Sequence, residues 1–180
     1  CSVFANLLPQ YLITPEEATL SINLFNKYLS KYKDKYEDTD QYKEIVKLIR
    51  KGIAIHHSGL IPILKEAIEM IYSQGLIKVL FATETFAVGV NMPTKTVIFS
   101  SLYKFDGITN RFLKPQEYTQ MAGRAGRRGL DTEGFVIHLS NLFDIDNSVE
   151  YKKMLCGNPA EIKSKFKISY NLILNVIASE

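Results

Sequence analysis

The sequence predicts an α/β fold in which a mostly parallel sheet is flanked by helices. Short apolar runs alternate along the chain with amphipathic segments of helical period, a pattern typical of strands that are linked by helices. The run at residues 77–82, apolar at all but one position, indicates a strand buried on both faces. A further helical segment, rich in Ile and Leu, is expected over residues 159–180 as a C-terminal helical extension.

The first part of the chain is predicted to be helical. A Thr-Pro-Glu-Glu run at residues 14–17 supplies a cap, a proline for the first helical position and the glutamate of a capping box. We therefore expect a helix over residues 15–33. A charged loop through residue 40 and a second helix over residues 40–51 follow, and Gly52 ends that helix.

The remaining elements set the expected domain boundaries. Strands are predicted over 53–56, 77–82, 96–101 and 135–139, and helices over 62–74 and 115–128. These elements divide the chain into four expected parts: a helical N-terminal part (1–52), a motif-bearing core (53–141), a linker (142–158) and the start of a following module (159–180).

Composition bounds the function without naming it. Apolar residues make up 46% and charged residues 23% of the 180, as in an ordinary soluble domain. The net charge is only +3, so any nucleic-acid site must be a local patch. Two distant cysteines favour a reducing cytosolic or nuclear setting, and three histidines without partner carboxylates give no reason to expect a metal. The chain has no apolar run of membrane-spanning length and no signal peptide, so no membrane partner is expected.

The strongest motif is an arginine- and glycine-rich segment at residues 120–129. If it is helical, its polar and basic residues share one face and its small residues share the other. The residues of the basic face are Gln120, Arg124, Arg127 and Arg128. Planar guanidinium forks suit phosphate oxygens and can stabilise charge on a transferring γ-phosphate. A solvated basic face is the alternative, but glycines inside a plain surface helix cost ~1 kcal/mol each.

Two further segments lie where strands are expected to end. After strand 77–82, Thr83 and Thr85 offer hydroxyls and Gly89 permits close approach of the backbone to a ligand. A structural turn explains this segment equally well. After strand 53–56, the corner at His57, Ser58 and Gly59 precedes a helix whose free N–H groups would favour an anion, although a capped turn is again an adequate explanation.

Taken together and in this order, these segments resemble the second RecA-like domain of the Ski2-like helicases of superfamily 2. Residues 120–129 are similar to motif VI of that family and residues 81–93 to motif V. The resemblance is dense over residues 53–139, and residues 166–175 look like the family's link into its winged-helix module. Short segments on either side of these motifs are most similar to exosome-associated RNA helicases of the superkiller-complex type. The nuclear exosome-cofactor helicase and DNA-repair members remain alternatives within the family.

The resemblance implies roles at a nucleotide site. Arg124 and Arg127 would contact the ATP γ-phosphate, with Arg127 as the arginine finger, and Gln120 would help to orient the nucleotide. Gly89 and Asn91 would approach the phosphate and the ribose. The DEAD-box relatives usually carry Asp where Asn91 stands, which puts direct contact with the ribose in doubt.

The resemblance also implies an RNA site and a strand-separating hairpin. Thr83, Thr85 and the corner at residues 57–59 would hold the phosphates of single-stranded RNA. Asp106-Gly107, between two β-prone runs, predicts a hairpin with a tight primed turn. Phe105 and Phe112 near its tip could then stack on the last base pair of a duplex, although an ordinary connecting hairpin is the alternative. Tyr103 stands where relatives often have Arg.

What the sequence lacks completes the expectation. It contains neither a Gly-Lys-Ser/Thr phosphate loop nor an Asp-Glu pair after a buried strand. The resemblance implies that both, with the ligands of Mg²⁺, belong to a first RecA-like domain upstream, so this chain alone is expected not to hydrolyse ATP. The implied partners are that domain, single-stranded RNA, and exosome or superkiller-complex subunits, with 3'-5' unwinding in the cytoplasm or nucleus. A non-catalytic nucleic-acid-binding module is the competing class.

Overall fold

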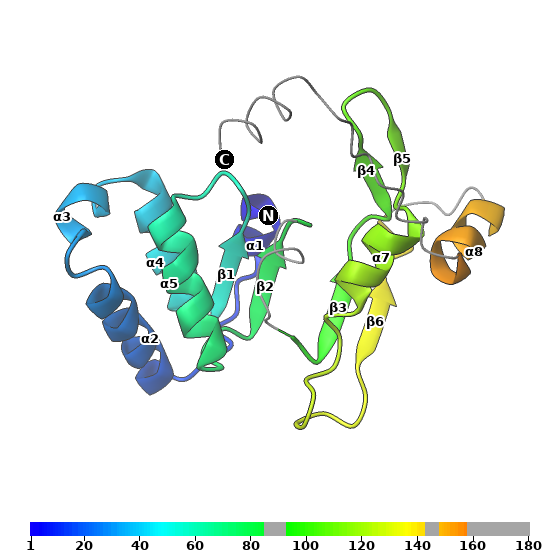
Figure 1. Cartoon of the computed structure of the whole chain (residues 1–180). Coiled ribbons are helices and arrows are strands. Elements are labelled where there is room, and N and C mark those ends of the chain that lie inside the picture. Colours follow the sequence, from blue (N-terminus) through cyan, green and yellow to red (C-terminus); the bar gives the residue numbers. More distant parts are fainter. Residues whose placement is uncertain (85–92, 143–147, 158–180) are drawn as a thin grey trace, which may run out of the picture. The chain divides into compact units, whose positions relative to one another are not determined.

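The computed structural model describes residues 1–84, 93–142 and 148–157 (Figure 1). The chain forms two compact units. The first comprises Cys1–Leu102 and Thr119–Asp144, and the second comprises Tyr103–Tyr118 and Ile145–Glu180.

The N-terminal part of the first unit contains most of the hydrophobic core. Its elements are α1 (Ser2–Leu7), α2 (Pro15–Tyr28), α3 (Lys33–Tyr36), α4 (Asp40–Ile49), β1 (Ile53–His56), α5 (Pro62–Ser73) and β2 (Val79–Ala82). Helices α4 and α5 pack on β1, α2 packs on α4 and α5, and α1 packs on both strands. The largest fully buried side chains between them include Phe25, Ile45, Leu48, Ile55, Leu64 and Ile68.

Both predicted helix starts and stops of this part rest on local chemistry. The capping box of α2 is present: the Thr14 hydroxyl accepts from the Glu17 N–H at 3.2 Å, and the Glu17 carboxylate accepts from the Thr14 N–H at 2.9 Å. The helix ends at Tyr28, earlier than predicted, because the Ser30 N–H bonds to the Lys27 carbonyl and tightens the last turn. Gly52 ends the α4 segment with a φ of 75°, as predicted.

Strands β1 and β2 pair in parallel, with Ile53 opposite Val79 and His56 opposite Ala82. The prediction of a strand at 77–82 buried on both faces is wrong in detail. The strand begins at Val79, its first three residues are half-buried and its last is exposed. The buried part of the apolar run, Leu76 and Ile77, lies in the connection before the strand.

A second parallel pair is formed by β3 (Thr96–Phe99) and β6 (Phe135–His138), with Thr96 opposite Phe135. The mostly parallel α/β architecture predicted from the sequence is therefore confirmed. Helix α7 (Pro115–Ala122) follows the hairpin described next and stops well before the predicted residue 128.

The second unit contains the predicted hairpin, whose strands are β4 (Tyr103–Phe105) and β5 (Asn110–Phe112). The predicted tight primed turn is wrong, because four residues, 106–109, connect the strands. Only Gly107 among them has a positive φ, 102°. The Asp106 carboxylate organises the loop by accepting from the N–H groups of Ile108 and Thr109 at 3.0 and 2.9 Å.

Helix α8 (Ser148–Cys156) lies in the second unit, within the segment interpreted as a linker, and packs against β5. The helical extension expected over residues 159–180 lies outside the described residues. Within the described ranges, no helix combines the length and apolar character that crossing a membrane requires.

Candidate functional site

The arginine-rich segment is not one helical face. Gln120 lies on α7, but the helix ends at Ala122, so Arg124, Arg127 and Arg128 lie on the loop that follows it. The prediction that the four share a helix face is wrong. Gly126 and Gly129 have φ values of 89° and 81°, a conformation that favours glycine. The glycines therefore serve to reverse the chain and not to bring a helix close to the sheet.

Backbone contacts fix the start of this loop beside β3. The Thr94 N–H donates to the Arg124 carbonyl at 2.9 Å, and the Gly126 N–H donates to the Thr94 carbonyl at 2.7 Å. Gly134 crosses the same backbone so closely that a Cβ placed on it would lie 2.6 Å from both Ala125 C and Gly126 N. The arginines are therefore carried by a backbone that is tied to the entrance of the β3–β6 pair.

Gly134→Ala is expected to lower the free energy of unfolding by about 1–3 kcal/mol, the usual cost of inserting a methyl group into tight packing. The clashing atoms are backbone atoms, which cannot rotate away as a side chain can. Urea denaturation of the chain measures the loss. Gly75→Ala is the control, because nothing lies within 4 Å of its added Cβ and only its φ of 73° is strained. If Gly134→Ala were as stable as the wild type, the close crossing would be contradicted.

Arg127 is held by Asp131. Its Nε and Nη2 atoms donate to the two carboxylate oxygens, each at 2.8 Å, and its backbone N–H donates to Oδ2 at 3.0 Å. The hydrogen bond from the Arg127 side chain holds the pKa of Asp131 at about 2, and the same pair raises the pKa of Arg127. The Asp131 side chain is 7% exposed and that of Arg127 is 45% exposed.

This pairing orients the guanidinium. One edge of the fork is occupied by Asp131, while Nη1 has no hydrogen-bond partner in the part of the chain that the structure describes. Sequence reasoning missed the role of Asp131, although its position four residues after Arg127 was a signal, since opposite charges at that spacing can meet within a turn or helix. A fork fixed along one edge can present the other edge to an anion with little loss of side-chain freedom.

The predicted RNA corner and Thr83 lie at the same end of the β1–β2 pair. His56 and Ala82 are opposite each other at the last register position, so His57 and Thr83 follow side by side. The Thr83 N–H donates to the His56 carbonyl at 3.1 Å, and Thr83, Ser58 and Gly59 are exposed. The structure thus brings together the residues predicted to contact RNA from two separate segments.

Protein groups already use most of the N–H groups of this corner. The Gly59 N–H donates to His57 Nδ1, the Leu60 N–H to the His57 carbonyl, and the Ile61 N–H to Gln41 Oε1. Gln41 also donates to the Gly59 carbonyl at 3.0 Å, a clamp that the sequence did not reveal. The expectation that free N–H groups would bind the anion is wrong for these three positions, which leaves the exposed side chains as the groups that can face a ligand.

The hairpin presents different apolar residues from those predicted. Phe105 is 62% exposed, as expected for a residue beside the tip. Phe112 is not near the tip, because the register places it opposite Tyr103, with ring centroids 4.4 Å apart. Ile108 in the loop is 88% exposed and takes the place that the sequence reasoning gave to Phe112. The departure at Tyr103 therefore has a packing role within the hairpin.

Three predicted site residues, Thr85, Gly89 and Asn91, lie outside the described residues. Within the described ranges no group of three or more His, Cys, Asp or Glu side chains could hold a metal ion.

Comparison with known proteins places this architecture in a family. The family described as "Helicase conserved C-terminal domain" matches residues 23–129. The chain is 48% identical over 167 residues to "ATP-dependent RNA helicase mtr4" of Schizosaccharomyces pombe, covering 91% of the chain and 14% of that protein. It is 44% identical over 178 residues to human "Superkiller complex protein 2" (98% of the chain, 14% of that protein) and 42% identical over 170 residues to human "Exosome RNA helicase MTR4" (93% and 16%).

The parallel α/β fold and the arginine loop define a RecA-like helicase domain. The chain belongs to the helicase C-terminal domain family, in its Ski2-like branch of superfamily 2. It spans only about a seventh of the length of these relatives.

Proposed function

We propose that this chain is the second RecA-like half of an ATP-dependent RNA helicase. The observation that carries the proposal is the Arg127 fork, held along one edge by Asp131 on a loop tied to the sheet. The relatives named as ATP-dependent or exosome RNA helicases support the nature of the substrate. ATP would bind between this domain and a first RecA-like domain of the same protein.

In this proposal, the chain supplies the charges that stabilise phosphoryl transfer. Arg127, through Nη1, would contact the γ-phosphate as negative charge spreads over its oxygens, and Arg124 would contact the same group. Gln120 on α7 would orient the nucleotide, and Gly89 and Asn91 would approach its phosphate and ribose. The ligands of Mg²⁺, which neutralises the phosphates, would come from the first domain.

The RNA strand would cross the end of the β1–β2 pair. Thr83, Thr85 and the corner at residues 57–59 would contact its phosphates without reading bases. Movement in the 3'-5' direction, delivery of RNA to the exosome and association with superkiller-complex subunits in the cytoplasm are further parts of the proposal, supported by the relatives' names and the motif resemblance. The nuclear exosome-cofactor role is the alternative within the family.

The deciding experiment measures ATP hydrolysis with and without single-stranded RNA, for the full-length protein and for this 180-residue chain. We expect RNA to stimulate the full-length protein and the chain alone to be inactive. Turnover by the chain above a contaminant control would contradict the division of the site between two domains. RNA binding without any hydrolysis by the full-length protein would favour a pure binding module.

Thr83→Ala in the full-length protein is expected to weaken single-strand binding roughly tenfold, about the net worth of one hydrogen bond to a charged group. Basal hydrolysis should survive, because Thr83 lies with the strand-end corner and not on the arginine loop. A filter-binding titration at fixed salt measures the affinity. Thr19→Ala, an exposed threonine on α2, is the control, and equal affinities for the two variants would remove Thr83 from the RNA site.

A further inference from the structure

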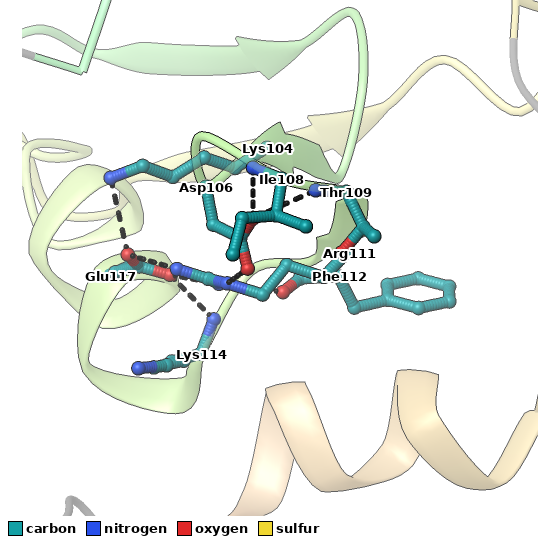
Figure 2. A network of polar contacts seen from close by, with 8 residues as sticks. All are labelled: Lys104, Asp106, Ile108, Thr109, Arg111, Phe112, Lys114 and Glu117. Carbon is teal, nitrogen blue, oxygen red and sulfur yellow. Dashed lines mark hydrogen bonds and ion pairs between the residues drawn. The ribbon is translucent and has the colours of Figure 1, made fainter.

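A cluster of charged side chains joins the hairpin to the first turn of α7 (Figure 2). Glu117 on α7 accepts from both terminal nitrogens of Arg111, at 2.8 and 3.0 Å, and from Lys104 Nζ at 3.2 Å. Arg111 belongs to β5 and Lys104 to β4, opposite each other in the hairpin register. One carboxylate thus binds both strands of the hairpin to the helix that follows them.

The cluster is partly shielded from water and stays charged. The three side chains are only 21–29% exposed. The hydrogen bonds from Arg111 are the largest cause that lowers the pKa of Glu117, to about 2. Glu117 is therefore ionised at every pH at which the protein would work, and a bidentate guanidinium–carboxylate pair fixes orientation as well as distance.

The contacts continue from Arg111 to the tip. Arg111 Nε lies 3.7 Å from Asp106 Oδ2, and the other oxygen of Asp106 accepts from the N–H groups of Ile108 and Thr109. The exposed loop residue Ile108 is therefore linked to α7 by an unbroken series of polar contacts through Asp106, Arg111 and Glu117. Figure 2 shows this series from the loop to the helix.

Capping of α7 alone does not account for the cluster. Glu117 also accepts from the Lys114 N–H at 2.8 Å, which is half of a capping box. That role needs one acceptor oxygen, and glutamine supplies it equally well. A cap requires no basic residue from either hairpin strand, yet Arg111 and Lys104 both converge on the same carboxylate.

We propose that Glu117 is a positioning residue that makes the hairpin and α7 move as one body, so that displacement of Gln120 during ATP turnover is transmitted to the hairpin tip. Gln120 lies on α7, three residues after Glu117. The proposal rests on the proposed function, since it assigns the coupling between hydrolysis and duplex opening. It predicts that breaking the clamp separates the two activities.

The test uses Glu117→Gln in the full-length protein, which keeps the capping acceptor and removes the charge. We expect single-strand-stimulated ATP hydrolysis within about twofold of wild type. The number of tailed duplexes opened per ATP should fall roughly tenfold, the rate equivalent of losing one hydrogen bond to a charged group. Arg111→Gln should give the same separation without touching the cap, and the double variant should be no worse than either single one, because both remove one contact.

Asp34→Asn, an exposed carboxylate on α3, is the charge-matched control and should leave both activities unchanged. A wild-type protein without RNA-stimulated hydrolysis would defeat the proposed function itself. If the wild type opens duplexes and Glu117→Gln keeps the same number per ATP, the clamp has no coupling role and only this inference fails. Losses that multiply in the double variant, or equal loss of both activities with a lowered urea midpoint, would also overturn it and leave Glu117 a stabilising residue.

Discussion

Arg127→Ala in the full-length protein is expected to lower kcat of RNA-stimulated ATP hydrolysis by ~10³ or more, while nucleotide affinity changes much less. The charge that Arg127 would stabilise grows in the transition state, so its loss appears in kcat and only weakly in ground-state binding. Arg127→Lys should not restore the rate, because an ammonium group cannot bind Asp131 along one edge and a phosphate along the other.

Steady-state hydrolysis and equilibrium nucleotide binding, measured on the same preparations, separate the two effects. Arg128→Ala is the matched control, since it removes the same charge from the neighbouring, exposed position. Near-normal kcat for Arg127→Ala would disprove its role as the finger. In that case Arg124, whose carbonyl is bound to Thr94 and whose side chain is half-buried, would become the better candidate.

The arginine loop shows where local sequence patterns lose their predictive power. The periodicity of residues 115–128 is consistent with one helix, and Gln120 does lie on a helix. The helix nevertheless ends at Ala122, because Gly126 turns back to Thr94 and crosses Gly134. Both contacts join segments that are distant along the chain, so a pattern read within a dozen residues could not contain them. The glycines were recognised as significant, but their role depends on these partners.

The same distinction explains the rest of the prediction. The capping box at Thr14 and the stop at Gly52 depend on neighbouring residues and were predicted correctly. The clamps made by Gln41 and Glu117 each depend on a partner from another element, and neither was predicted. The hairpin stands between these cases: Asp-Gly indicated its position, but the Asp106 side chain, by binding two backbone N–H groups, fixed a longer loop.

The register of the hairpin determines which substitutions should abolish strand separation. Phe105 and Ile108 are the exposed apolar residues at the tip, whereas Phe112 packs on Tyr103 and belongs to the hairpin's structure. Deleting the whole hairpin would also remove Lys104 and Arg111 from the Glu117 clamp. Changing only the two tip residues therefore tests the wedge without disturbing the clamp or the loop contacts of Asp106, which use backbone N–H groups.

The double variant Phe105→Ser/Ile108→Ser in the full-length protein is expected to open a tailed duplex at least tenfold more slowly, while single-strand-stimulated ATP hydrolysis persists. Stacking of a side chain on a base is worth ~1–3 kcal/mol, and a serine retains almost none of it. Leu20→Ser, which removes an apolar side chain that is 50% exposed on α2, controls for a general loss of surface apolar area. Unwinding measured beside hydrolysis decides the matter. If the tip variant opens duplexes at the control rate, the hairpin is not a wedge. If both activities fall together, the hairpin acts through its support of α7, the helix that leads into the arginine loop.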